Sequence, residues 1–89
     1  MSRTPAPAEI AAAILAGVAR RRPGATLCPS EVARALAGQD GDWRALMPAV
    51  RDAAALLLAD GRIAVTQRGR AVAADIAGPI RLGRPPAGP

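Results

Sequence analysis

Arginine is the residue type whose positions in this sequence best indicate chemistry, because all twelve basic side chains are arginine. Arg44 and Arg51 are seven residues apart, close to two turns of a helix, so both project from one side of it. Arg68 and Arg70 flank Gly69 in a segment typical of a turn. A guanidinium group donates in a planar fork that matches a phosphate or the edge of a guanine. The spacing therefore predicts two places where the chain contacts an anionic polymer.

These arginines also have a simpler interpretation. Arg44 and Arg51 can be solvated surface charges, or they can pair with Asp40, Asp42 or Asp52. The turn can be an ordinary hairpin connection, in which its glycine supplies a positive φ and its arginines protect a sheet edge. The arginine-bearing side of the helix lacks Asn, Gln, Ser and Thr, so it favours contact with phosphates over detailed reading of bases.

The overall charge points to the same class of partner. The formal net charge is +5 and the isoelectric point is near 11.5. A balance of this size favours an anionic partner such as nucleic acid. The densest run of charge, Arg20 to Arg22, lies at the predicted end of the first helix. There it either complements the helix dipole or adds a phosphate contact.

Other residue types exclude several classes of function. The chain has one cysteine and no histidine, which excludes an internal disulfide framework, a structural zinc site and a Ser-His-Asp or Cys-His pair. Neither a phosphate-binding loop nor paired carboxylates at a recognisable spacing are present. We therefore expect no enzyme activity, no cofactor, no metal and no small-molecule substrate. The N-terminus does not resemble a signal peptide, and no apolar run reaches the roughly 20 residues of a membrane span, so we expect a cytoplasmic protein.

Two helices are predicted in the first half of the chain. The first covers about 8–22, with Ile10, Ile14, Leu15 and Val18 on one face, and the Pro-Gly pair at 23–24 ends it. The second runs from residue 29 to about 37. Glu31, three residues after Cys28, resembles the acidic member of a capping box.

A third helix must position Arg44 and Arg51. Asp42 is its predicted N-cap, and Trp43 is predicted to pack between the second and third helices rather than form an exposed stacking platform. Pro48 interrupts the helical spacing, so we expect a helical turn at 43–46 and the main helix at 48–59. The inward face is predicted to carry Met47, Val50, Ala54 and Leu57.

Short strands are predicted around these helices. The segment 62–67 alternates, which predicts a half-buried strand, and 71–72 and 79–82 are expected to pair with it after the Arg68-Gly69 turn. A further short strand is expected at 25–27. The predicted organisation is a flexible segment at 1–7, one domain at 8–82 and a disordered Pro/Gly-rich tail at 83–89.

The sequence blocks CPSEVARAL, DWRALMPAVR, LLLADGRI, VTQRGR and GPIRL resemble those of a known family. It is a family of small uncharacterised bacterial proteins, the domain of unknown function three-two-five-three. The resemblance covers about residues 10–82 and implies a winged-helix fold, without implying a biochemical activity.

The prediction is an α+β winged helix-turn-helix, with three helices and a small antiparallel sheet. Its predicted function is binding of double-stranded DNA with low sequence specificity, through Arg44, Arg51, Arg68 and Arg70. The alternative is a protein-interaction or homodimerisation module without DNA binding, in which the alanine-rich side of the first helix packs against a partner.

Overall fold

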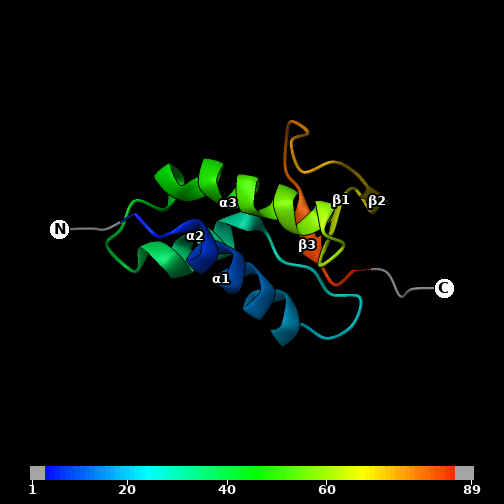
Figure 1. Ribbon diagram of the computed structural model, residues 1–89, viewed down its shortest axis with the longest axis horizontal. Coiled ribbons are helices and arrows are strands. Elements are labelled where there is room, and N and C mark those ends of the chain that lie inside the picture. Colours follow the sequence, from blue (N-terminus) through cyan, green and yellow to red (C-terminus); the bar gives the residue numbers. More distant parts are fainter. Residues whose placement is uncertain (1–3, 86–89) are drawn as a thin grey trace.

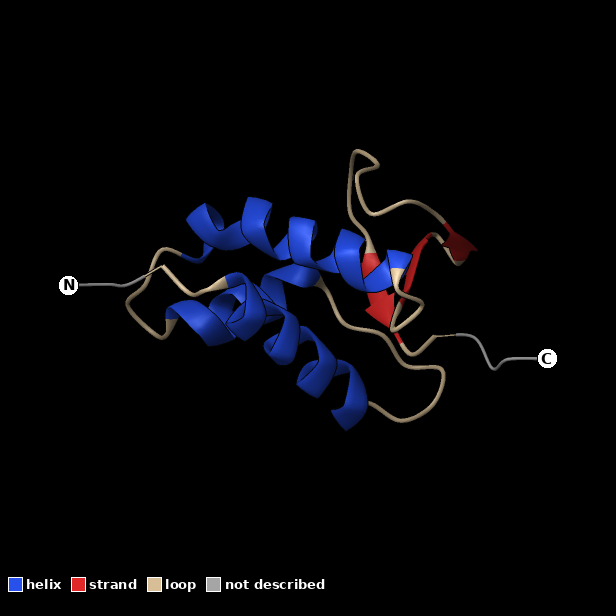
Figure 2. Cartoon of the chain, in the orientation of Figure 1, coloured by secondary structure: helices blue, strands red, loops and turns tan. Residues whose placement is uncertain are grey.

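The computed structural model describes residues 4–85, which form three helices followed by a three-stranded antiparallel sheet, an α+β arrangement (Figure 1). Helix α1 spans Pro7–Arg20, α2 spans Pro29–Ala37 and α3 spans Trp43–Ala59. Strands β1, β2 and β3 span Ala64–Gln67, Arg70–Ala71 and Arg81–Gly83. The helices fill one end of the domain and the strands gather at the other (Figure 2).

Helix α1 begins and ends slightly earlier than predicted. Its first residue is Pro7. The fixed φ of proline suits the first helical position, and its missing N–H costs nothing there, because an N–H at this position has no acceptor within the helix. Arg21 is the C-cap, with extended backbone, so only Arg20 of the arginine run is helical. The predicted apolar face is confirmed, because Ile10, Ile14 and Val18 are buried and Leu15 is half-buried against the core.

The predicted bounds of α2 are confirmed at both ends. The backbone N–H of Cys28 donates to Glu31 Oε2 at 2.7 Å, which is the carboxylate half of a capping box. The Cys28 side chain does not complete the box; its Sγ accepts a hydrogen bond from Ser30 Oγ at 3.1 Å. At the other end Gly38 has a φ of +79° and its N–H donates to the Arg34 carbonyl.

The prediction that Pro48 divides the third helix is wrong, because α3 is continuous from Trp43 to Ala59. A proline removes one helical hydrogen bond, here the bond that the Arg44 carbonyl would accept. Arg44 and Pro48 both lie on the exposed side, where water can bind that carbonyl. The inward side keeps its packing through Val50, so the apolar contacts outweigh the lost bond. The Asp42 cap is confirmed, since Oδ1 accepts from the Ala45 N–H at 3.3 Å.

Strand β1 occupies the centre of the sheet. It pairs with β2 through Thr66 and Ala71, and with β3 through Val65 and Leu82. Its start at Ala64 is two residues later than predicted, after Gly61 and the buried Ile63. The bounds of β2 and β3 differ from the predicted returning segments by one or two residues at each end.

The strand predicted at 25–27 is a single bridging residue, Leu27. Its N–H and carbonyl exchange hydrogen bonds with Leu82 at 2.9 and 2.8 Å, which extends the sheet beyond β3. The predicted domain boundary at residue 83 lies inside β3, where Gly83 is buried. The predicted tail continues through 86–89, and the predicted flexible segment begins with 1–3; these seven residues lie outside the described range.

One aliphatic core joins the helices to the sheet. Within residues 4–85 no polar or charged side chain is buried, so every charged group described lies at the surface or partly exposed. The core consists of Ile10, Ile14, Val18, Leu27, Val32, Ala33, Val50, Ala53, Ala54, Leu57, Ile63, Val65, Ala74, Ile80 and Leu82. Trp43 is half-buried and packs against this core. In the described part of the chain no helix is long and apolar enough to cross a membrane; the cytoplasmic location stays a prediction.

Candidate nucleic-acid interface

Arg68 and Gly69 form the turn between β1 and β2, and Arg70 begins β2, so two arginines lie at the tip of this hairpin. Arg68 and Gly69 have φ values of +53° and +81°, the positive values at both central positions that a tight I′ hairpin requires. Gln67 pairs with Arg70 on either side of it. The side chains of Arg68 and Arg70 are exposed and make no hydrogen bond or ion pair within residues 4–85.

Arg51 lies on the predicted side of α3, but its guanidinium group is bound within the domain. Its guanidinium group donates to three carbonyls of the loop between β2 and β3, those of Ala74, Ile76 and Gly78. The distances are 3.5, 2.5 and 3.2 Å. Arg51 is only partly exposed, and its donors hold the loop against α3. It pairs with none of the carboxylates suggested by the sequence.

Gln67 completes the support of the same loop. Its Nε2 donates to the carbonyls of Ala77 and Pro79 at 3.0 and 3.1 Å. The loop from 72 to 80 makes few backbone hydrogen bonds, so these two side chains supply most of the partners of its carbonyls. Sequence reasoning did not identify this role of Gln67.

Arg44 lies at the far end of α3 from the sheet, beside Trp43. Its Cζ is 4.5 Å from the centre of the indole ring, and the Cζ of Arg34, from α2, is 4.4 Å from the same centre. Both contacts have cation–π geometry. Trp43 is thus neither a fully buried core residue nor a free stacking platform, because it packs on the core and carries two guanidinium groups.

The arginine run at the end of α1 contributes one ion pair. Arg21 donates to Glu31 Oε1, which links the end of α1 to the first turn of α2. The pKa of Glu31 is lowered, first by the hydrogen bond from the Cys28 N–H. Burial opposes the shift, and the charge and hydrogen bond of Arg21 and the charge of Arg81 lower the pKa further. Arg20 and Arg22 are exposed and make no ion pair within the described residues.

Two arginines near the C-terminus tie β3 to the segment after α1. Arg81 donates through Nε to Thr26 Oγ1 at 2.9 Å and through a terminal nitrogen to the Thr26 carbonyl at 3.0 Å. Arg84 donates to the carbonyls of Ala19 and Arg21, at the C-terminal end of α1. These carbonyls carry the negative end of the helix dipole, so the cation is well placed there.

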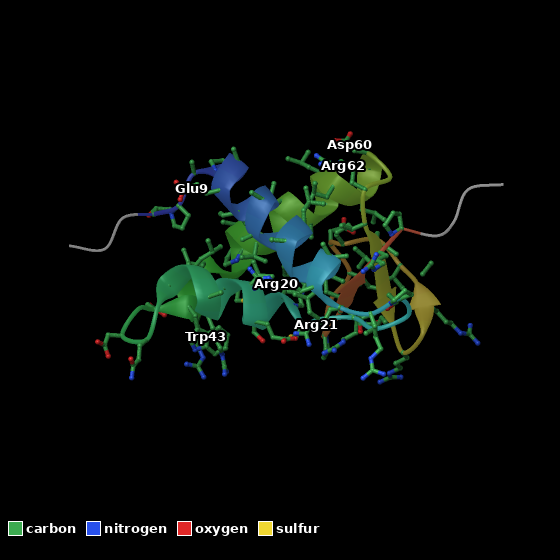
Figure 3. The ribbon with its side chains drawn as sticks, turned by 90° about the horizontal axis from the view of Figure 1, so that it is seen from below. Glu9, Arg20, Arg21, Trp43, Asp60 and Arg62 are labelled. Carbon is green, nitrogen blue, oxygen red and sulfur yellow. The ribbon has the colours of Figure 1, made fainter. Side chains whose placement is uncertain are left out.

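The four arginines predicted to bind DNA do not form one cluster. Arg44 is at the start of α3, Arg51 is under the loop, and Arg68 and Arg70 are at the hairpin. The view in Figure 3 instead separates two edges of the molecule: Trp43 and Arg21 lie along one, and Glu9, Asp60 and Arg62 along the other.

Sequence reasoning missed Arg34 and Arg81, although a signal for each was present. Arg34 comes three residues after Glu31, so the two share the exposed side of α2. Arg81 lies between the buried Ile80 and Leu82, and strand alternation places it on the opposite, outer face of the sheet. No group of three or more His, Cys, Asp or Glu in the described residues is arranged to hold a metal ion.

Comparison with known proteins agrees with the resemblance drawn from the sequence blocks. No curated protein matches the chain significantly. Residues 7–85, which cover almost all of the described chain, match a family described as a protein of unknown function, DUF3253. The chain therefore belongs to the DUF3253 family.

Proposed function

We propose that this domain is a winged helix that binds double-stranded DNA through the phosphate backbone, with low sequence specificity. The winged-helix arrangement determines which helices and strands can contact DNA. The arginines without partners determine which of these elements attract it.

The winged-helix arrangement is supported by the order in which the strands pair. The chain runs from α1 through the bridging residue Leu27 to α2 and α3, and then to β1 and β3. β3 lies between Leu27 and β1 in the sheet. Leu27, which comes between α1 and α2 in the sequence, therefore pairs with the sheet that the chain forms after α3. In this interpretation α2 and α3 are the helix-turn-helix pair, and the chain from 68 to 80 between β1 and β3 is the wing.

The observation that carries the DNA proposal is the pair of unpartnered arginines at the hairpin, Arg68 and Arg70. A tight turn holds their backbone, while their side chains are exposed and bond to nothing within residues 4–85. Placing two cations on a projecting turn without neighbouring acids costs stability through repulsion, and phosphate groups relieve that repulsion. Arg44 supplies a third cation at the other end of the domain.

Low specificity is expected because the outward side of α3 has few polar side chains that could form hydrogen bonds with the edges of bases. Between Arg44 and the end of the helix this side consists of Pro48, Ala55 and Asp52, together with Arg51, whose donors the loop already uses. Discrimination between base pairs needs donors and acceptors facing the groove. Contacts to phosphates instead give binding that depends on salt and tolerates sequence.

The test is fluorescence anisotropy of a labelled duplex of about 20 base pairs, titrated with protein at about 50 mM and about 200 mM salt. We expect the affinity to fall steeply as salt rises. In the variant Arg68→Ala/Arg70→Ala the slope of log K against log salt should become shallower by about 2, one for each lost phosphate contact.

Arg62→Ala is the control for the loss of a positive charge outside the hairpin, since Arg62 is exposed and lies on the edge with Asp60 (Figure 3). Its slope should equal that of the wild type. A folded wild-type protein that binds no duplex at the lower salt concentration would end the DNA proposal.

One observation favours the alternative of a protein-interaction module. Leu56 is 67% exposed and lines an apolar groove of about 510 Å³ between α1 and α3, beside Pro7, Ile10 and Ala49. Sedimentation of the protein without DNA tests this alternative. A dimer that dissociates on Leu56→Glu substitution, in a protein without affinity for duplex, would support it.

A further inference from the structure

Four arginines lie in one row that runs over the start of α3, the exposed side of α2, the end of α1 and β3. Arg44 and Arg34 lie on Trp43, and Arg34 shares the exposed side of α2 with Glu31. Glu31 binds both the Cys28 N–H and the side chain of Arg21. Arg81 continues the row, because it is bonded to Thr26, two residues before Cys28. We name Arg44, Arg34, Arg21 and Arg81 the arginine ridge.

The ridge leads toward the hairpin. Arg81 pairs across the sheet with Thr66 of β1, and Arg68 is the second residue after Thr66. The long axis of the molecule is horizontal in Figure 3, and Trp43 and Arg21 follow one another along it on the same edge. From Trp43 to Arg21 the row therefore follows the direction of the long axis, as a linear ligand would require.

The charges distinguish the ridge from the outward side of α3. The ridge has four arginines and a single carboxylate, Glu31, which Arg21 already pairs with. The outward side of α3 beside the loop has Arg51 and two carboxylates, Asp52 and Asp75. A polyanion is attracted to the first surface and repelled from the second.

The Trp43 end of the ridge also has room for a ligand. An open hollow of about 560 Å³ lies against Arg34 and Trp43, and its remaining lining comes from Ala35, Gly38 and Gln39. Stacking on the indole ring holds the two guanidinium planes in place before binding, so less side-chain freedom is lost on contact. The acids Asp40 and Asp42 in the adjoining turn mark where the ridge ends.

We propose that the arginine ridge, rather than the outward side of α3 beyond Arg44, is the surface along which the backbone of duplex DNA lies, with the hairpin arginines as its continuation. This inference rests on the proposed function, because it names the surface for that activity. It differs from the usual winged-helix arrangement, in which the third helix enters the major groove. Trp43, the only aromatic residue, reports directly on contact at the ridge.

The test compares Arg34→Ala with the matched control Arg62→Ala, which removes the same charge from the other edge. Within residues 4–85 the Arg34 side chain makes no hydrogen bond or ion pair, and its cation–π contact with Trp43 is partly exposed, so we expect the variant to fold. We expect Arg34→Ala to weaken duplex binding about tenfold at low salt, which corresponds to about 1.4 kcal/mol. Arg34→Glu should weaken it further, and Arg62→Ala should stay within about twofold of wild type. Unlabelled duplex should change the emission of Trp43 in the wild type.

The outcomes separate the two proposals. If wild-type protein binds no duplex, the proposed function fails, and the ridge as a DNA surface fails with it. If the wild type binds duplex through Arg68 and Arg70 while Arg34→Ala matches Arg62→Ala and Trp43 emission is unchanged, only the ridge is overturned. A protein that binds an acidic peptide through Arg34 and binds no duplex would also overturn both.

Discussion

The chain makes two turns between β1 and β3, and arginine has a different role at each. At the hairpin the backbone ladder shapes the turn, so Arg68 and Arg70 are left exposed and without partners in the described structure. In the loop from 72 to 80 the backbone makes few bonds of its own, and Arg51 supplies donors to three of its carbonyls. A guanidinium group is available to a ligand only where the backbone has satisfied its own polar groups.

The pair of Arg21 and Glu31 lies between these extremes. It links α1 to α2, yet both side chains keep more than 40% of their surface exposed, at 42% and 44%. An exposed ion pair of this kind contributes little to stability, because water competes for both partners. The guanidinium group of Arg21 therefore binds Glu31 and still has exposed surface that an anion could contact. One substitution at the loop, one at the ion pair and one at the hairpin measure how much each group contributes to the stability of the fold and how much to binding.

The largest effect is expected for Arg51→Ala. This change leaves the carbonyls of Ala74, Ile76 and Gly78 without their charged donor, and hydrogen bonds to charged groups contribute about 1.5–3 kcal/mol each at most. Because the site is partly exposed and water can replace some of the bonds, we expect unfolding to become easier by about 2–3 kcal/mol. Urea denaturation monitored by circular dichroism measures this. Under the same conditions the free energy of unfolding of Arg68→Ala should stay within about 0.5 kcal/mol of wild type. If both variants lost the same stability, Arg51 and Arg68 would not differ in their contribution to the fold.

A smaller effect, dependent on pH, is expected for Glu31→Gln. The pKa of Glu31 is lowered in the folded protein from its ordinary value of 4.5 by the Cys28 N–H and Arg21. The ionised carboxylate thus stabilises the fold above pH 4.5, and that contribution is lost as pH falls through the lowered folded pKa.

At neutral pH the Glu31→Gln variant should be less stable by about 0.5 kcal/mol, since the ion pair is exposed. The difference from wild type should shrink as the pH is lowered from about 5 toward about 3, in steps of about half a unit, in the urea denaturation curves. A difference that stays constant over that range would mean that the charge of Glu31 has no net effect on stability.

The smallest change in stability is expected for Arg68→Asn. Arg68 has a positive φ of +53°, a conformation that asparagine adopts more easily than arginine, and Asn-Gly is a favoured pair in such hairpins. The variant should be as stable as wild type or more stable by a few tenths of a kcal/mol. Its affinity for duplex DNA should fall, with a salt slope shallower by about 1. Denaturation and anisotropy on the same sample compare the two; an affinity equal to wild type would mean that Arg68 serves only the turn.

Sequence reasoning succeeded wherever a few adjacent residues decide the local structure. The start of α2 follows from Cys28, the proline after it and Glu31, and its end follows from Gly38. The tight turn follows from Arg68-Gly69 and its flanking strand. Sequence reasoning failed at Pro48. It took account of the one hydrogen bond that proline removes, but not of the apolar packing that holds the rest of α3 in a helix.

The roles of individual arginines were harder to predict than the elements that carry them. Helical spacing placed Arg44 and Arg51 on one side of α3, and the structure leaves Arg44 exposed and Arg51 partly exposed there. Spacing gave no information on the loop from 72 to 80, whose carbonyls lie 23 to 27 residues further along the chain from Arg51. Nor did it show that Arg34, from another helix, would lie on the same indole ring as Arg44.

The sequence by itself determined the number of helices, the caps of α2 and α3, the apolar faces and the basic character of the surface. These follow from composition, from periodicity and from interactions within about four residues. The tertiary structure alone decided which guanidinium groups are bound to carbonyls and which are free. That choice depends on which backbone groups remain unsatisfied once distant segments pack together, as with Arg51 under its loop and Arg81 on Thr26.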